Sequence, residues 1–406
     1  MDDTSLHIAV IGAGPVGLAL ALHAARALPA SQISLFDARP LAKDVSGDPR
    51  TLALSLGSVQ WLEHLGAWDA ASAQPIVEVH VSQQPPSGLP FIGAWWHEPE
   101  LRIKAIDEGV PLLGAVQSYG GLVAPMQRAW EAEEARDPTR LHSRFGTPVA
   151  ACKGLEHAVE VDAGIAERFD LAIVAEGGVF ADQLAKLRDP DDRPPLRHDY
   201  QQTAWVGRVS FEPGAARSPG VAFERFTRHG PAALLPLASG DAALVWCVPS
   251  NDDPVKALDD AQRVAVLNSI FHPAVGRIAS ITPLKQFALG LNAERTLSIG
   301  RTVRIGNAAQ TLHPVAGQGL NLGLRDAHDL VRALAKNRDV DAVLRRLEWQ
   351  RGPDRWAMIA ATDFLARSFT WALPGAGAAR GLGIAALQAL SPLKSMIARQ
   401  MMFGRR

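Results

Sequence analysis

The sequence predicts an α/β fold in which a Rossmann-like dinucleotide-binding domain carries an inserted mixed α+β domain and a C-terminal helical segment. Three observations support this fold class. An apolar run near the N-terminus breaks into glycines and then continues with helical spacing, strand-like runs fill the middle of the chain, and a second glycine-rich segment begins at Gly306. We therefore expect two segments far apart in the sequence to serve one cofactor.

The first glycine-rich segment has the pattern of a strand, a tight turn and a helix. The apolar run Ile8-Ala-Val-Ile is followed by Gly12, Gly14 and Gly17, and then by an apolar helix-forming stretch. Gly12 permits the turn, Gly14 lets the backbone approach a pyrophosphate, and Gly17 lets the helix pack closely on the strand. The first N–H groups of that helix are then free to bind phosphate oxygens.

Asp37 completes this unit. It ends a second apolar run, Ile33-Ser-Leu-Phe36, and lies about twenty residues after Gly17, where a carboxylate accepts hydrogen bonds from a ribose hydroxyl. The alternative is an ordinary strand-end carboxylate that faces water. The spacing favours the ribose interpretation, so the unit predicts a bound dinucleotide.

Composition and charge exclude several classes of protein. The chain has 406 residues, of which 47% are hydrophobic, and this excludes disordered and fibrous classes. Its 41 basic residues nearly balance its 42 acidic residues, so bulk charge offers no argument for nucleic-acid binding. Cys152 and Cys247 lie in apolar surroundings without partners at metal-ligand spacing, so we expect both to be buried and the compartment to be reducing.

No signal peptide or membrane-spanning run is predicted. The acidic N-terminus enters the first strand at once, and no uncharged apolar run reaches the length of a bilayer span. We expect a cytoplasmic protein, with peripheral contact at the inner membrane as an alternative. The C-terminal tail, residues 393–406, has apolar and cationic residues at amphipathic spacing, and its packing on its own domain is preferred over docking on a membrane or a partner.

The order of elements divides the chain into six segments. We expect secondary structure to alternate between the nucleotide domain and an inserted, largely β domain. The predicted boundaries are a first part of the nucleotide domain at 1–75, a substrate-domain insertion at 76–101, a second nucleotide part at 102–184, a β-rich substrate domain at 185–284, a third nucleotide part at 285–340 and C-terminal helices at 341–406.

Individual elements follow from periodicity and from breaks. Helical spacing is seen at 59–65, 112–135 and 322–335, and in most of the last sixty residues, with breaks expected at 375–377 and 381–383. Strands are expected at 157–162, 169–175, 203–211, 221–226, 242–248 and 301–305. The stretches 84–90 and 188–195 are proline-rich and are expected to be a break and a linker. Trp95, Trp96 and His97 either form an aromatic cluster that faces the substrate or only fill space between packed elements.

The second glycine-rich segment has the features of a site for a flat, electron-rich ring. Gly306 ends a strand, and Asn307 offers a side chain that can hydrogen-bond a polyol. Pro314 fixes the following loop, while Gly317 and Gly319 remove side chains where a ring must approach the backbone. The loop runs into a helix N-terminus, which favours negative charge on the ring. An isoalloxazine fits these demands.

At this point the segments resemble those of a known family. They look like the class A FAD-dependent aromatic hydroxylases of the p-hydroxybenzoate hydroxylase fold, and more narrowly their 2-polyprenylphenol hydroxylase branch from ubiquinone biosynthesis. The matching pieces are the N-terminal glycines, Asp48-Pro-Arg50-Thr-Leu-Ala-Leu, the stretch from Phe223 to Pro236, and the stretch from Gly306 to Ala327. They are spread over most of the chain.

The resemblance implies a cofactor and a set of binding residues. FAD would be held through Gly12, Gly14, Gly17 and Asp37, with Arg50 near the pyrophosphate or on the path of a mobile flavin. Asn307, which follows Gly306, would contact the ribitol or the pyrophosphate. The ring would be lined by Pro314, Gly317, Gln318, Gly319 and Asn321. Arg50 could instead form a surface salt bridge, and a structural role is preferred for His313, Tyr119 and Tyr200.

The resemblance also implies a reaction. NAD(P)H reduces FAD, the reduced flavin reacts with O2 to give a C4a-hydroperoxide, and one oxygen atom is transferred to the ring of a polyprenylated phenol. No catalytic side chain and no metal ion is assigned. One departure is clear, because Glu176 stands where the family has Asp before Gly177, and this puts the reductant contact in doubt. Alternative interpretations are another flavoprotein of the same fold or a flavin-bearing scaffold of a biosynthetic complex, which would have no substrate turnover.

Overall fold

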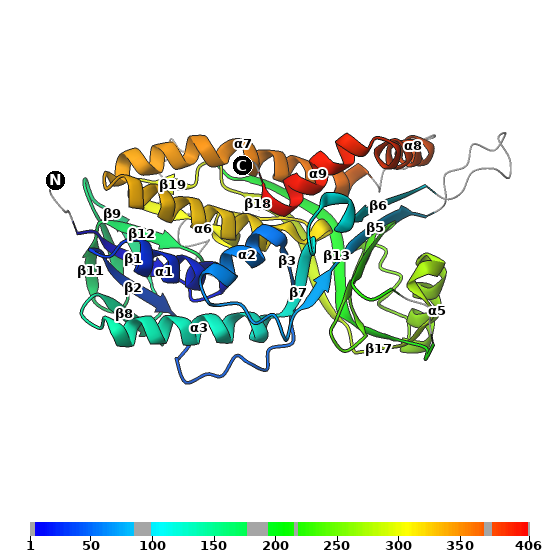
Figure 1. Ribbon diagram of the computed structural model, residues 1–406, viewed down its shortest axis with the longest axis horizontal. Helices are drawn as coiled ribbons and strands as arrows, with labels where there is room; N and C mark the ends of the chain where they lie inside the picture. The colour runs from blue at the N-terminus through cyan, green and yellow to red at the C-terminus, as the bar shows by residue number, and fades with distance from the viewer. Residues whose placement is uncertain (1–4, 85–98, 177–193, 215–217, 369–375, 405–406) are drawn as a thin grey trace.

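Two large sheets lie side by side and are joined by a small third one (Figure 1). The computed structural model describes residues 5–84, 99–176, 194–214, 218–368 and 376–404. The first sheet has six strands and the second has nine. This arrangement confirms the predicted α/β class with an inserted mixed domain and a C-terminal helical segment.

The first sheet is the nucleotide-binding sheet, with the strand order β19-β20-β12-β1-β2-β8. All neighbours are parallel except β19, which runs antiparallel to β20. The strands predicted at 8–11, 33–36, 169–175 and 301–305 are confirmed as β1, β2, β12 and β20. Its members are β1 (His7–Ile11), β2 (Gln32–Asp37), β8 (Leu141–Phe145), β12 (Leu171–Val174), β19 (Ser298–Ile299) and β20 (Thr302–Arg304).

Both faces of this sheet are covered. Helix α1 is buried along most of its length because α3 and α6 flank it, which explains its nearly uninterrupted apolar sequence. On the opposite face, Ile11 and Phe36 pack against a three-stranded sheet of order β11-β10-β9. The elements are α1 (Pro15–Ala27), α3 (Tyr119–Arg136), α6 (Gln318–Lys336), α7 (Val340–Ser368), β9 (Ala151–Gly154), β10 (Val159–Asp162) and β11 (Ala166–Phe169).

The second sheet has the strand order β21-β18-β13-β16-β15-β14-β5-β6, and β17 pairs with β13 off this path. It is antiparallel except for the β14–β5 pair. One face packs on helix α5 through an apolar cluster that includes Trp205 and Trp246. The elements are β5 (Glu78–Gln83), β6 (Glu100–Lys104), β13 (Leu196–Phe211), β14 (Val221–Thr227), β15 (Gly230–Pro236), β16 (Ala242–Pro249), β17 (Ile278–Ile281), β18 (Lys285–Ala293), β21 (Gln310–Thr311), α5 (Asp260–Ile270) and the short helix η2 (Pro273–Val275).

Some predictions of elements are wrong at their boundaries. The helix expected at 112–135 begins only at Tyr119, because residues 114–118 form β7 (Gly114–Ser118), which pairs with β3 (Thr51–Ser55) and β4 (Gln74–Ile76). Pairing with distant strands overrides the local helical pattern here. The helix predicted at 59–65 is confirmed as α2 (Leu56–His64).

The C-terminal segment forms two helices, α8 (Ala376–Ala389) and α9 (Ser391–Phe403). The expected break at 381–383 is wrong, because α8 continues through both glycines, which cost a helix only about 1 kcal/mol each. Ala398 and Met402 of α9 are buried against residues of α2 and β6, so the preferred packing of the tail on its own domain is confirmed.

Among the described residues, no single helix is long and apolar enough to cross a membrane, although α8 and α9 together, bent by 93°, pass that test. The prediction that both cysteines are buried is also confirmed. The Trp95–His97 cluster and Gly177, with most of the two proline-rich stretches, lie outside the described residues. The division into six segments stays a prediction.

Candidate functional site

The turn after β1 requires two of its three glycines for steric reasons. Gly12 has φ of 102°, and a Cβ on Gly17 would lie 1.8 Å from the Gly12 carbonyl oxygen. Gly14 differs, because a Cβ added there would meet only the Tyr119 hydroxyl, at 3.9 Å. The space next to Gly14 is therefore open, as a backbone that receives a pyrophosphate requires.

Asp37 lies beside this turn at the end of β2. Its Oδ2 accepts a hydrogen bond from the Ala13 amide at 2.6 Å, and its Oδ1 accepts one from the Arg39 amide at 2.7 Å. Its side chain is mostly buried, with 17% exposed. Asp37 is thus not a free carboxylate in water, and it holds the turn in place. Its contact with a ribose stays a prediction.

The second glycine-rich segment reaches the same place from the other end of the chain. Gly306 begins the short helix η3 (Gly306–Ala308) at the end of β20, and it has φ of 59°. A Cβ on Gly306 would lie 3.2 Å from Val16, and one on Gly323 would lie 2.6 Å from the Gly306 Cα. Helices α1 and α6 pack together, so the two glycine-rich segments meet.

Asn321 fixes the loop that precedes α6. Its Oδ1 accepts hydrogen bonds from the Ser55 amide at 2.7 Å and the Ser58 hydroxyl at 2.8 Å, while its Nδ2 donates to the carbonyls of Ala53 at 3.1 Å and Gly317 at 3.0 Å. The side chain is almost fully buried. Its amide therefore serves the protein's own structure, and the two serines are partners that the sequence analysis did not predict.

The loop beside Asn321 leaves room for a ring. Gly317, the last residue of the short helix η4 (Val315–Gly317), has φ of 58°, which favours glycine. Gly319 follows in the first turn of α6, and a Cβ added there would meet no atom within 4 Å. Gln318 is buried and accepts a hydrogen bond from Arg325 at 3.3 Å, Pro314 is half-buried, and Asn307 is exposed.

These residues fit FAD. Open space at Gly14 and Gly319 lies at two helix N-termini that the Val16–Gly306 contact brings together, and a helix N-terminus favours a phosphate or an electron-rich ring. Asp37 lies beside the first of these positions. The individual binding roles of the predicted residues stay predictions.

Arg50 forms the salt bridge that was the alternative to a role near the cofactor. Its Nη2 lies 2.8 Å from Asp48 Oδ2, and its guanidinium carbon lies 4.1 Å from the centre of the Tyr119 ring. The side chain is 63% exposed, so the pair itself adds little stability. Asp48 holds the Arg50 pKa above its usual value, and the cation stays beside Tyr119 and hence close to Gly14.

Glu176 lies against the N-terminal turn. Its Cβ would be 2.9 Å from a Cβ on Gly12, so the two segments are in close contact. Burial raises the pKa of the Glu176 carboxyl, and the nearby Asp37 carboxylate raises it further. Glu176 thus places a second acidic group beside Asp37, next to the predicted ribose site.

His313 and Tyr200 have structural contacts. His313 Nε2 lies 3.1 Å from Gln202 Oε1, its Nδ1 accepts from the Val315 amide at 3.2 Å, and burial lowers its pKa to about 4. Tyr200 packs edge-on against the His313 ring and donates to Asp363 at 3.1 Å. These contacts agree with the structural roles preferred for both residues.

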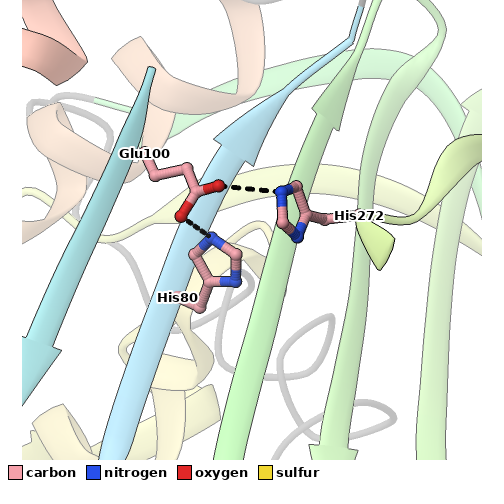
Figure 2. A group of neighbouring side chains, drawn as sticks. All are labelled: His80, Glu100 and His272. Carbon is pink, nitrogen blue, oxygen red and sulfur yellow. Dashed lines mark ion pairs between the residues drawn. The ribbon is translucent and has the colours of Figure 1, made fainter. Parts of the chain in front are cut away.

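A second group of polar side chains lies on the sheet face that packs toward α5. Glu100 bridges His80 Nε2 at 3.0 Å and His272 Nε2 at 2.8 Å (Figure 2). The three ligand atoms lie close enough for a metal ion. However, His272 Nδ1 accepts a hydrogen bond from the Ala274 amide, so a neutral His272 carries its proton on Nε2 and donates it to Glu100. A metal-binding histidine needs the opposite arrangement.

Comparisons with known proteins agree with this site. A family model described as an FAD binding domain matches residues 198–361. The 3-demethoxyubiquinol 3-hydroxylase of Escherichia coli is 28% identical over 97% of each chain. The ubiquinone hydroxylase UbiL of Rhodospirillum rubrum is 36% identical over 50% of this chain and 48% of its own length. The chain thus carries an FAD-binding domain and is similar over its full length to a ubiquinone-biosynthesis hydroxylase.

Two solved structures share the fold of this chain. The p-nitrophenol 4-monooxygenase PnpA of Pseudomonas putida superposes with a TM-score of 0.72 at 15% identity, covering 99% of each chain. Klebsiella pneumoniae HpxO, complexed with FAD and uric acid, gives a TM-score of 0.70 at 17% identity, and the match covers 98% of this chain and 97% of HpxO. The matched FAD-binding domain makes FAD the cofactor of this chain, and NAD(P)H is the reductant typical of the hydroxylases that it resembles.

Proposed function

We propose that this protein is a monooxygenase that inserts one oxygen atom of O2 into the aromatic ring of a polyprenylated phenol during ubiquinone biosynthesis, with NAD(P)H as reductant. The observation that carries this proposal is the end-to-end similarity to the E. coli 3-demethoxyubiquinol 3-hydroxylase. The meeting of the two glycine-rich segments supports it, because such a reaction needs a flavin site and we assign that site to these segments.

Different residues would hold different parts of FAD. The turn at Gly12, Gly14 and Gly17 would receive the pyrophosphate, and Asp37 would contact the ribose. The N-terminus of α6, from Gly317 to Asn321, would approach the ring. When bound, FAD supplies the activation of O2 and the transfer of one of its oxygen atoms to the substrate.

The rest of the chain must place the phenol and keep water away. The loop that precedes α6, residues 313–317, is called the flavin loop below. Phe226 of β14 packs on Val315 of this loop, and Gln202 of β13 contacts His313 of the same loop. The second sheet thus meets the flavin loop directly through two of its strands. We infer that the substrate ring binds between this sheet face and the flavin.

Complementation tests the proposed function. The chain is expressed in an E. coli strain that lacks 3-demethoxyubiquinol 3-hydroxylase, and the quinones are measured by mass spectrometry. We expect the demethoxy intermediate to disappear and ubiquinone to return. Flavin-loaded protein that leaves the intermediate unchanged, and that hydroxylates no other prenylated ring in the extract, would contradict the proposal and favour a scaffold or another flavoprotein.

We also propose that the α8–α9 surface contacts the membrane that holds the substrate. Exposed apolar side chains gather on these helices, with Leu390 53% exposed and Met396 61% exposed. Lys394 and Arg399 lie on the same short helix. Apolar groups next to cations are typical of peripheral contact with an anionic lipid surface.

Vesicle binding tests this contact. Met396→Glu is expected to reduce co-sedimentation with vesicles of anionic phospholipid several-fold, because a charge replaces an apolar contact. Ile165→Glu is the matched control, since Ile165 is 76% exposed in the turn between β10 and β11, at the opposite end of the molecule from α8 (Figure 1). Equal binding by both variants would contradict the proposed surface.

A further inference from the structure

We propose that Glu224 is the residue that binds the hydroxyl of the substrate ring and takes its proton. The ring then becomes more electron-rich and reacts more readily with the oxygen atom that is transferred to it. This inference rests on the proposed function and names the side chain that acts on the substrate. Four features of the structure support it: the sheet face on which Glu224 lies, its place next to the flavin loop, its apolar neighbours, and its lack of a hydrogen-bond or ion-pair partner among the described residues.

Strand alternation puts Glu224 on the face of the second sheet that is turned away from α5. Its neighbours in β14, Phe223 and Arg225, belong to the α5 side, where Phe223 packs in the apolar cluster and Arg225 donates to the Ile270 carbonyl. Successive side chains of a strand point to opposite faces. Glu224 therefore shares its face with Phe226, two residues later.

Phe226 locates this face relative to the cofactor site. It is buried against Val315, which lies two residues before Gly317 in the loop that leads into α6. One strand spacing of two residues is about 7 Å. The Glu224 side chain is thus roughly that distance along the sheet from a residue that touches the flavin loop, which suits a group that holds one edge of an aromatic substrate.

The surroundings of Glu224 are apolar and partly accessible to solvent. By register, its partners on the two neighbouring strands are Val81 of β5 and Ala233 of β15, and Ala233 in turn pairs with Val245 of β16. All three of these small side chains are half-buried, and Glu224 also keeps part of its surface accessible. A carboxyl among small, partly accessible apolar groups can be reached by a flat ring.

Glu224 has no partner of its own in the described part of the chain. Its side chain makes no hydrogen bond or ion pair among the described residues, whereas the buried acids Glu294 and Glu108 are paired with Arg304 and Arg399. An unpaired carboxyl in such a position is costly for the protein alone. The cost is repaid if a ligand supplies the missing hydrogen bond.

The chemistry of the carboxyl fits this task. Burial raises the Glu224 pKa to about 8, so the ionised and the protonated forms are both present near neutral pH. In the ionised form a carboxylate oxygen accepts the proton of the ring hydroxyl. The O–H bond of the ring breaks, an O–H bond forms on Glu224, and the electron pair stays on the ring oxygen, which activates the ortho and para carbons. The proton is released to water after the product leaves.

The experiment compares flavin-loaded wild type with Glu224→Gln across pH 6 to 9.5, with NAD(P)H and a short-chain demethoxyubiquinol as the substrate. We expect wild-type kcat/KM to rise with an apparent pKa near 8, and Glu224→Gln to lose this rise and about 100-fold of its activity at pH 8.5. Glu224→Asp should keep the rise at reduced rate. Glu212→Gln is the control, since Glu212 follows β13 and pairs with Arg277 at the surface.

A second readout does not depend on activity. Because the Glu224 pKa is raised by folding, the charged carboxylate costs stability as pH rises from about 4.3 toward 8. Glu224→Gln should therefore melt above wild type at pH 8 and equal to it at pH 4.5, while it keeps full flavin content. These two melting results would show that Glu224 is an unpaired buried acid in the folded protein.

The outcomes separate this inference from the proposed function. If wild type makes no hydroxylated product from any prenylated phenol, the proposed function fails. If wild type is active and Glu224→Gln keeps both its rate and the rise near pH 8, the role of Glu224 is overturned and the proposed function stands. Loss of flavin from Glu224→Gln would also overturn the role, because the residue would then support the cofactor and not the substrate.

Discussion

Two glycines of this protein allow cofactor binding to be tested separately from folding. A Cβ at Gly14 would have only the Tyr119 hydroxyl near it, and a Cβ at Gly319 would have no atom within 4 Å. Neither glycine has a positive φ. Alanine at either position is therefore compatible with the folded chain, but its methyl group would occupy space that we assign to the pyrophosphate or the ring of FAD.

The expected magnitudes follow from these positions. Gly319→Ala lies in the first turn of α6 and should stabilise the cofactor-free protein by about 0.5–1 kcal/mol, because alanine favours a helix over glycine. Gly14→Ala replaces a helix N-cap and should cost up to about 1 kcal/mol. For FAD, an inserted methyl group in a close contact costs about 1–3 kcal/mol, which weakens binding by roughly 5-fold to more than 100-fold.

The assay measures both quantities on the same protein. Thermal unfolding of cofactor-free protein gives the stability, and titration with FAD, followed by flavin fluorescence, gives the dissociation constant. Gly17→Ala is the contrasting variant, because its Cβ would lie 1.8 Å from the Gly12 carbonyl oxygen and should prevent folding. If Gly14→Ala and Gly319→Ala both fold and both bind FAD as wild type does, the two segments do not enclose the cofactor and the assignment is refuted.

Three further predictions concern the residues around this site. Asn321→Leu should cost about 3–5 kcal/mol in urea unfolding, because it leaves the Ser55 amide and two carbonyls buried without partners, whereas Asn251→Leu at the surface should change little. The neutral form of His313 stabilises the fold fully above pH 6.5, and this stability is lost as pH falls toward 4, with about 2 kcal/mol lost at pH 5. His313→Gln should therefore flatten the plot of unfolding free energy against pH between 6.5 and 4. An unchanged plot would contradict the burial argument. Glu176→Gln should raise the melting temperature more at pH 8 than at pH 4, since the carboxyl pKa is raised by burial and by Asp37, and an effect of the opposite sign would exclude repulsion between the two acids.

The sequence predicts those parts of the molecule that local patterns determine. The turn at Gly12 and Gly17 is predictable because each glycine meets a steric demand within a single strand–turn–helix unit. The long helix α6 follows from its strongly amphipathic pattern. The meeting of the N-terminal and late segments was inferred from their shared chemistry, and the contact between Val16 and Gly306 is its physical form.

Other features depend on partners far away in the sequence. Residues 114–118 have a helical pattern but pair with β3 as a strand, and β15 escaped prediction because its two prolines are typical of loops. Asn321 was expected near the ring, yet its amide is used by Ala53, Ser55, Ser58 and Gly317. Glu224 could have been singled out as the one acid of its strand, but only the sheet register shows that it lies on the face next to the flavin loop.

Isotope labelling tests the central claim most directly. Purified flavin-loaded protein is supplied with NAD(P)H, a short-chain demethoxyubiquinol and 18O2, and the product is analysed by mass spectrometry. The account predicts a product that is heavier by one 18O atom on the aromatic ring, and no label when 18O is supplied as water. Consumption of NAD(P)H with only hydrogen peroxide formed, or a product that takes its oxygen from water, would contradict it.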